Sequence, residues 1–103
     1  MSGAAFNDTI HQPVRLKLMA ALDAEPGGGA LDFARLKAIS EATDGNLGAH
    51  LNTLGSAGFI EVSKVPVGKR TRTLVAITAS GRAAFRAHIF YLQELVEAVG
   101  SRT

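Results

Sequence analysis

Small polar side chains recur along the segment 43–57 at the spacing of one face of an α-helix. On a helical wheel the leucines at 47, 51 and 54 share one side, and the candidate contact residues point outward or sideways. Amides and hydroxyls suit base edges and phosphates, and small residues allow close approach. A solvated face, the alternative, would more often carry Lys and Glu. The candidate nucleic-acid contacts are Thr43, Asn46, Gly48, Ala49, His50, Asn52 and Thr53.

His50 lies at the border of the leucine stripe, and two roles for it stay open. It is either a half-buried histidine hydrogen-bonded within the fold or a contact to a phosphate or a base. A metal site is disfavoured because the three histidines of the chain fall in three different predicted elements, without an i, i+4 pair and without any cysteine. We expect no metal and no cofactor.

The positive charge of the chain is concentrated in one stretch. The sequence has 11 Lys and Arg against 9 Asp and Glu, yet residues 63–93 hold six bases and no acid. Four of these bases lie on or beside a predicted hairpin loop: Lys64, Lys69, Arg70 and Arg72. Beside the segment 43–57 they would bind phosphates or the minor groove, with an affinity that falls with salt. The alternative is a charged loop that only improves solubility.

Nothing in the chain indicates catalysis or a membrane span. There is no cysteine, which removes thiol nucleophiles and disulfides. The glycines at 27–29 are not followed by the Lys and Ser of a phosphate-binding loop, and no nucleophile has a base at a catalytic spacing. The apolar runs are far shorter than the roughly 18 residues of a membrane helix, and no signal segment opens the chain. We expect a cytoplasmic protein without catalytic residues or a membrane partner.

Local signals predict the elements that position these residues. Pro13 suits the first turn of a helix, the proline and three glycines at 26–29 end that helix, and an alternating pattern follows Gly58. Two short helices with a link of about three residues form a helix-turn-helix. We expect a single domain over 1–103, with a loose arm over 1–10, helices over 13–24, 32–40 and 43–57, a hairpin over 59–77 and a final helix over 78–99.

The final helix carries more apolar surface than one protomer needs. Its apolar residues cover roughly 200° of the wheel, about twice the stripe of an ordinary surface helix. A chain of 103 residues has little material to cover the second side, so we expect a homodimer. The predicted interface residues are Phe85, Ile89, Phe90, Leu92, Leu95, Val96 and Val99. Arg15 lies in the apolar arc of the helix 13–24. It either forms an ion pair at the interface or extends its charge past the apolar surface to solvent.

Four stretches of the chain resemble the MarR/ArsR-like group of winged helix-turn-helix transcriptional regulators. They are His11 to Leu16, Thr43 to Leu51, Leu54 to Ile60 and Leu74 to Arg82, within residues 11–90. The resemblance implies an α+β, mainly α, fold, with a two- or three-stranded wing sheet and a long C-terminal dimerisation helix. It also implies that a homodimer reads palindromic operator DNA with the helix 43–57 as recognition helix and with a basic wing.

Two features depart from that group. Gly48 and Gly55 stand where relatives usually carry a serine and a charged residue, which lowers helix propensity and removes two candidate contacts. The metal-sensing branch of the group uses cysteine ligands, and this chain has none.

The sequence thus predicts sequence-specific binding of double-stranded DNA by a homodimeric transcriptional regulator, most simply a repressor that covers a promoter. Two alternatives stay open. One is a winged-helix module that binds a protein through its hairpin. The other is a ligand-sensing regulator that holds a small apolar effector at the dimer interface, near Phe90, Tyr91 and the helix 13–24.

Overall fold

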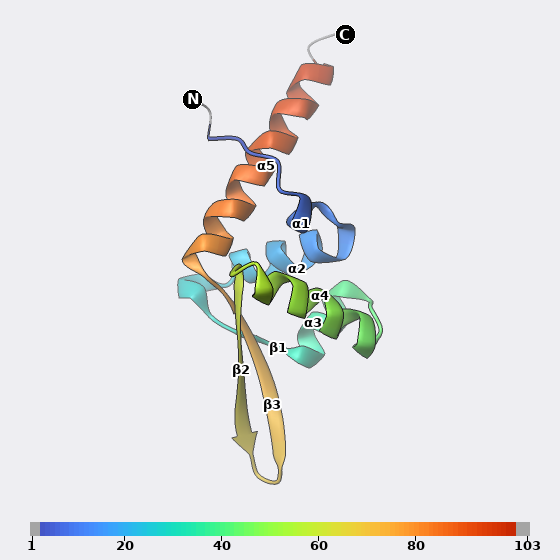
Figure 1. Cartoon of the computed structure of the whole chain (residues 1–103), viewed down its shortest axis with the longest axis vertical. Helices are drawn as coiled ribbons and strands as arrows, with labels where there is room; N and C mark the ends of the chain where they lie inside the picture. Colours follow the sequence, from blue (N-terminus) through green and yellow to red (C-terminus); the bar gives the residue numbers. More distant parts are fainter. Residues whose placement is uncertain (1–2, 101–103) are drawn as a thin grey trace.

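The computed structural model describes residues 3–100 and has an elongated shape, 59 × 25 × 23 Å along its principal axes. The helices α2, α3 and α4 form a body from which the hairpin β2–β3 and the far half of α5 project in opposite directions (Figure 1). The fold is α+β and mainly helical, as predicted. Its elements are α1 (Asp8–His11), α2 (Pro13–Ala24), the 3-10 turn η1 (Pro26–Gly28), β1 (Leu31–Asp32), α3 (Phe33–Ser40), α4 (Asp44–Ser56), β2 (Ile60–Val67), β3 (Arg70–Ile77) and α5 (Ala79–Gly100).

The wing is a three-stranded antiparallel sheet in the order β1-β3-β2. Strands β2 and β3 pair from Ile60 opposite Ile77 to Val67 opposite Arg70, so the hairpin closes with only two residues in its loop. The first of them, Gly68, has φ 63°, a left-handed conformation that favours glycine. The hairpin is therefore long and narrow, and its tip lies far from the helical body (Figure 1).

One apolar core holds the helices against the base of the sheet. The leucine stripe of α4 lies in this core, as its spacing predicts, so the opposite side of α4 faces outward. Strand β1 pairs with β3 and thereby joins the sheet to the start of α3. The buried core residues are Ile10, Leu18, Met19, Leu22, Leu36, Leu47, Leu51, Leu54, Ile60, Val75, Ile77 and Phe85.

The turn between α4 and β2 packs directly against the start of α5. The Thr78 hydroxyl donates to the Gly58 carbonyl at 2.6 Å and accepts from the Gly81 N–H at 2.9 Å. The Thr78 N–H donates to the Phe59 carbonyl at 3.0 Å. A Cβ atom on Gly81 would lie 2.0 Å from that same carbonyl oxygen, so only glycine fits there. These contacts fix the start of α5 to the end of α4.

The prediction of a loose arm over 1–10 is wrong for residues 3–10; residues 1–2 lie outside the described part of the chain. The short helix α1 begins at Asp8, and Ile10 is fully buried. The Asn7 side chain caps this helix by accepting from the Ile10 N–H at 3.0 Å. The Ala5 N–H donates to the Ala87 carbonyl of α5 at 3.0 Å. Local capping and contacts with a distant helix together order this segment.

His88 of α5 holds the N-terminal segment through both of its ring nitrogens. The side chain is fully buried, and Nδ1 accepts from the Asn7 N–H at 3.0 Å. Its Nε2 lies 3.1 Å from Nδ1 of His11, and the Phe6 ring packs on both imidazoles. Because Nδ1 of His88 accepts, the ring proton lies on Nε2 and is donated to His11. Burial, and then the neighbouring His11, lower the pKa of His88.

Two of the three histidines therefore converge, although they lie 77 residues apart. Nevertheless, no group of three or more His, Cys, Asp or Glu side chains that could hold a metal ion occurs among residues 3–100.

Candidate nucleic-acid interface

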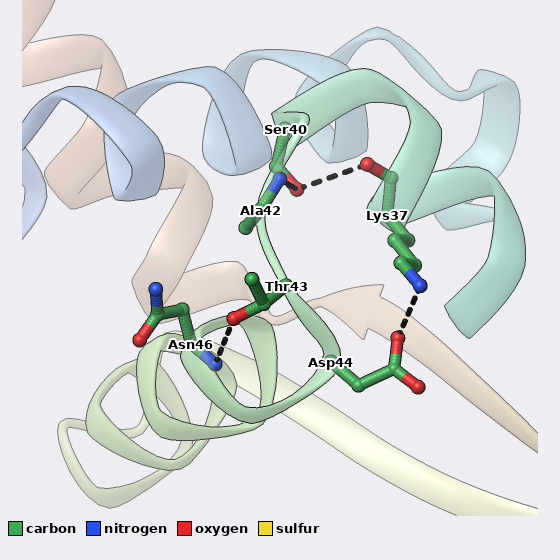
Figure 2. A network of polar contacts seen from close by, with 6 residues as sticks. All are labelled: Lys37, Ser40, Ala42, Thr43, Asp44 and Asn46. Atoms are coloured by element: carbon green, nitrogen blue, oxygen red, sulfur yellow. Dashed lines mark hydrogen bonds and ion pairs between the residues drawn. The ribbon is translucent and has the colours of Figure 1, made fainter.

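A tight turn between α3 and α4 sets the direction of α4. Glu41 ends α3 in a left-handed conformation with φ 57°, and its N–H donates to the Lys37 carbonyl at 2.9 Å. The Ser40 hydroxyl donates to the same carbonyl at 3.3 Å and accepts from the Ala42 N–H at 3.3 Å (Figure 2). The turn is thus held by its own polar groups, and α4 begins two residues later.

The start of α4 is capped and electrically balanced. The Thr43 hydroxyl accepts from the Asn46 N–H at 3.2 Å, so the side chain of Thr43 serves first as the helix cap (Figure 2). Asp44 would repel a phosphate here, but its carboxylate pairs with Lys37 Nζ at 2.6 Å. The ion pair reduces that repulsion and leaves the remaining N–H groups of the first turn near the surface.

The outward side of α4 is small and polar, as predicted. Within residues 3–100, the Asn46 and Asn52 side chains take no hydrogen-bond partner, so both amides are free to meet another molecule. The Thr53 hydroxyl is occupied, because it donates to the Ala49 carbonyl at 3.1 Å. The exposed candidates on this helix are Asn46, Gly48, Ala49, Asn52 and Thr53.

His50 is half-buried on the side of α4 that faces α2. Its Nδ1 accepts from Nη1 of Arg15 at 3.1 Å, and Arg15 Nε also donates to the Thr9 carbonyl. Because Nδ1 accepts, the neutral ring carries its proton on Nε2. Burial, and then the charge of Arg15, lower the pKa of His50. Of the two roles left open for His50, the hydrogen bond within the fold is present, and Arg15 joins α1, α2 and α4.

The four predicted wing cations differ in their surroundings. Lys64, Lys69 and Arg70 are exposed, and none forms an ion pair with any residue from 3 to 100. Arg72 instead pairs with the Asp32 carboxylate at 2.7 Å. Three cations of the hairpin are therefore free to bind phosphate, whereas Arg72 is held within the fold.

Asp32 explains why Arg72 is held. Its carboxylate caps α3 by accepting from the Arg35 N–H at 2.8 Å, and its second oxygen takes the guanidinium of Arg72. The Arg35 N–H, and then Arg72, lower the pKa of Asp32. Arg72 thereby joins the wing to the first helix of the helix-turn-helix.

A groove of about 720 Å³ runs between α4 and the hairpin. Gly48, Asn52 and Gly55 line it on the helix side, and Val62 and Lys64 line it on the strand side. A Cβ atom on either glycine would have no heavy atom within 4 Å, so the missing side chains leave this groove open. Sequence reasoning identified the two glycines as departures from relatives but missed the groove, which requires the packing of the hairpin beside α4.

The far half of α5 has an exposed apolar surface. Phe90, Leu95, Val96 and Val99 are 53%, 48%, 72% and 70% exposed. Phe85 is instead buried in the protomer's own core, so its prediction as an interface residue is wrong. Ile89 packs partly against the same core, and Leu92 is half-buried. Despite this surface, no helix in the described part of the chain has the length and apolar character needed to cross a membrane.

Comparison with solved structures finds the same fold. A transcriptional regulator homologue from Pyrococcus horikoshii OT3 aligns with a TM-score of 0.78 at 27% identity, over 88% of this chain and 87% of that chain. A protein with a GntR superfamily winged-helix-turn-helix domain from Halomicrobium mukohataei gives 0.67 at 27% identity, over 92% and 70%. NadR in complex with 4-hydroxyphenylacetate shares the fold, with a TM-score of 0.68 at 20% identity over 92% and 64%.

Sequence comparison also indicates a winged-helix protein. An uncharacterized protein from Methanocaldococcus jannaschii is 38% identical over 82 residues, which are 80% of this chain and 86% of that protein. Residues 14–96, from α2 into the far half of α5, match the model of a winged helix DNA-binding domain. The chain therefore belongs to the winged helix DNA-binding domain family.

Proposed function

We propose that the protein is a MarR/ArsR-like transcriptional regulator that binds palindromic operator DNA as a homodimer and represses by covering a promoter. One observation carries the proposal: the free amide of Asn52 on α4 and the free cation of Lys64 on the hairpin line the two sides of one open groove. With α4 in the major groove, the hairpin meets the neighbouring backbone and minor groove. The matched family is a DNA-binding one, which favours a binding protein over an enzyme.

The structure supports different roles for the candidate residues. Base and backbone contacts come from the exposed side of α4, and phosphate contacts come from Lys64, Lys69 and Arg70. Thr43 and His50 act indirectly, since Thr43 caps α4 and His50 joins it to Arg15. Arg72 contributes through the ion pair with Asp32 that holds the wing. The direct contacts on α4 are Asn46, Gly48, Ala49, Asn52 and Thr53.

The proposed dimer forms through α5. Its exposed apolar residues lie beyond the helical body, where a second copy can pack without touching α4 or the wing (Figure 1). A two-fold dimer presents the same surface twice, and a palindromic operator requires two recognition helices about 34 Å apart. The interface that we propose consists of Ile89, Phe90, Leu92, Leu95, Val96 and Val99.

Salt dependence of DNA binding tests the proposal. Each phosphate contact contributes about 0.9 to the slope of log K against log salt, so K69A/R70A should flatten that slope by up to about 1.8. K17A is a matched control, since Lys17 is an exposed cation of α2 with no ion pair among residues 3–100. If K17A flattens the slope as much as K69A/R70A does, or if the slope is unchanged in K69A/R70A, the wing does not contact DNA phosphates.

A second candidate function is ligand sensing. A groove of about 360 Å³ lies between α2 and α5, lined in part by Asp23, Arg86 and Phe90. Asp23 lies 3.4 Å from Arg86, so the groove offers both charged and apolar walls. NadR, which shares this fold, was crystallised with 4-hydroxyphenylacetate. Thermal-shift assays with small apolar metabolites should give a rise in Tm that F90A abolishes; no rise with any compound would contradict ligand sensing.

A further inference from the structure

The exposed side of α4 lacks the residue types that recognise G·C base pairs. The commonest specific contact with guanine is made by Arg or Lys, and contacts to cytosine N4 come from Asp or Glu. Asp44 is the exception on this helix, but its carboxylate is paired with Lys37. After Asp44, the exposed residues of α4 are Gly45, Asn46, Gly48, Ala49, Asn52, Thr53, Gly55 and Ser56.

Asn52 has the most open position on this surface. Its neighbours one turn away on the same side are Gly48 and Gly55, and neither position has a heavy atom within 4 Å of a would-be Cβ. The Asn52 amide takes no partner among residues 3–100. An asparagine amide pairs with N6 and N7 of adenine through two hydrogen bonds. The flanking glycines allow the helix to come close enough for this contact.

Ala49 and Thr53 form an adjacent row of methyl groups. The Thr53 hydroxyl donates its proton to the Ala49 carbonyl, which leaves the Thr53 methyl and one weak acceptor for an outside partner. Alanine and threonine methyls contact the C5 methyl of thymine. Four residues of helix rise about 6 Å, close to two base-pair steps of about 3.4 Å. The two methyl groups can therefore meet thymines about two base-pair steps apart.

The wing also favours DNA rich in A·T pairs, through the minor groove. Tracts of A·T pairs have a narrow minor groove whose enhanced negative potential attracts Arg and Lys. Lys69 and Arg70 are exposed at the tip of the hairpin and are free of ion pairs among residues 3–100. We infer that each protomer selects a short run of A·T base pairs, with adenine at Asn52 and thymine at Ala49 and Thr53. This inference rests on the proposed DNA-binding function.

Selection of bound duplexes from a random pool tests the inference. Wild-type protein should enrich adjacent A·T pairs in each half-site, with adenine favoured at one position by roughly 5- to 100-fold, the discrimination of one bidentate contact. N52A should lose the preference at that position only, and N52R should change it to guanine. Q93A removes an exposed amide of α5 and serves as the control that changes nothing.

Replacing thymine with uracil tests the methyl contacts, because it removes only the C5 methyl. Wild-type affinity should fall about threefold to fivefold at a contacted thymine, as expected for one buried methyl group. T53S keeps the hydroxyl that bonds to Ala49 but lacks the methyl group. At the position that Thr53 contacts, this variant should therefore bind the thymine duplex and the uracil duplex with equal affinity.

The outcomes separate the two proposals. Strong binding to sites with G·C pairs at the selected positions would overturn the A·T inference and leave the proposed function intact. Unchanged position preferences in N52A, or equal wild-type affinity for thymine and uracil duplexes, would also overturn it. Absence of any duplex binding would overturn the proposed function and this inference together.

Discussion

Two glycine-to-alanine substitutions should change stability in opposite directions. Gly48 lies within α4 with no heavy atom within 4 Å of a new Cβ, so G48A should gain the helix propensity of alanine, about 1 kcal/mol. For a domain of this size that gain corresponds to a rise in Tm of roughly 4–8 °C. The same substitution at Gly81 places a Cβ 2.0 Å from the Phe59 carbonyl oxygen.

To accommodate that Cβ, G81A must separate two backbone segments by more than about 1 Å, since ordinary contacts begin near 3.4 Å. The separation weakens the bonds of Thr78 to Gly58 and Phe59, worth about 1 kcal/mol each, and adds overpacking of about 1–3 kcal/mol. After subtraction of the helix-propensity gain, the free energy of unfolding should fall by about 2 kcal/mol or more. This corresponds to a decrease in Tm of roughly 10 °C.

Denaturation of both variants and the wild type, followed by circular dichroism, measures these changes under one set of conditions. Wild-type stability in G81A would refute the tight junction between α5 and the turn after α4. A lower Tm in G48A would refute the open position of Gly48. DNA binding adds a second test, because the new methyl lies beside Asn52: G48A should be more stable than wild type and bind duplex DNA more weakly. Unchanged affinity would mean that DNA does not approach Gly48 closely.

Three further predictions concern pH, association and His50. Burial and His11 hold the pKa of His88 below its ordinary 6.5, so the native state binds fewer protons than the unfolded chain, and the free energy of unfolding should fall as the pH drops below 6.5. The fall should be smaller in H88Q, and equal stability at about pH 8 and about pH 5.5 would contradict it. L95E should convert a dimer to a monomer in light scattering, whereas Q93E on the polar arc of α5 should not; a monomeric wild type would refute the interface. R15Q removes the charge beside His50, so the pKa of His50 should rise in NMR titration, and an unchanged value would show that Arg15 does not set it.

The helices and the hairpin could be placed from sequence because their ends are set by local chemistry. Asp32 and Thr43 cap the two helices that they precede, and Pro13 opens α2. The expected and observed bounds of α2 to α5 and of the hairpin accordingly differ by no more than one residue. The polar side of α4 followed from the same periodicity, since its leucines must face the core.

Contacts between distant residues could not be predicted in this way. The segment 3–10 is ordered by His88 and Ala87, about 80 positions away, and nothing in its own composition shows this. Arg72 is separated from Asp32 by 40 residues, so its charge looked free. Phe85 shares one stripe of the last helix with Val96 and Val99, and the helical wheel does not show where along the helix this stripe leaves the protomer's own core.

The tight junction at Gly81 couples the position of α5 to the turn that follows α4. The 22 residues of α5 extend about 33 Å, so a tilt of about 10° displaces the far end by about 6 Å. Because the near end is held to the turn that follows α4 by the contacts of Thr78 and Gly81, a tilt of α5 acts directly on the end of α4. In a dimer joined at the far ends, a small change of crossing angle there would reset the distance between the two recognition helices. Under the proposed function, a change of this distance alone would weaken binding to a palindromic site, with the proposed contact residues of α4 unchanged.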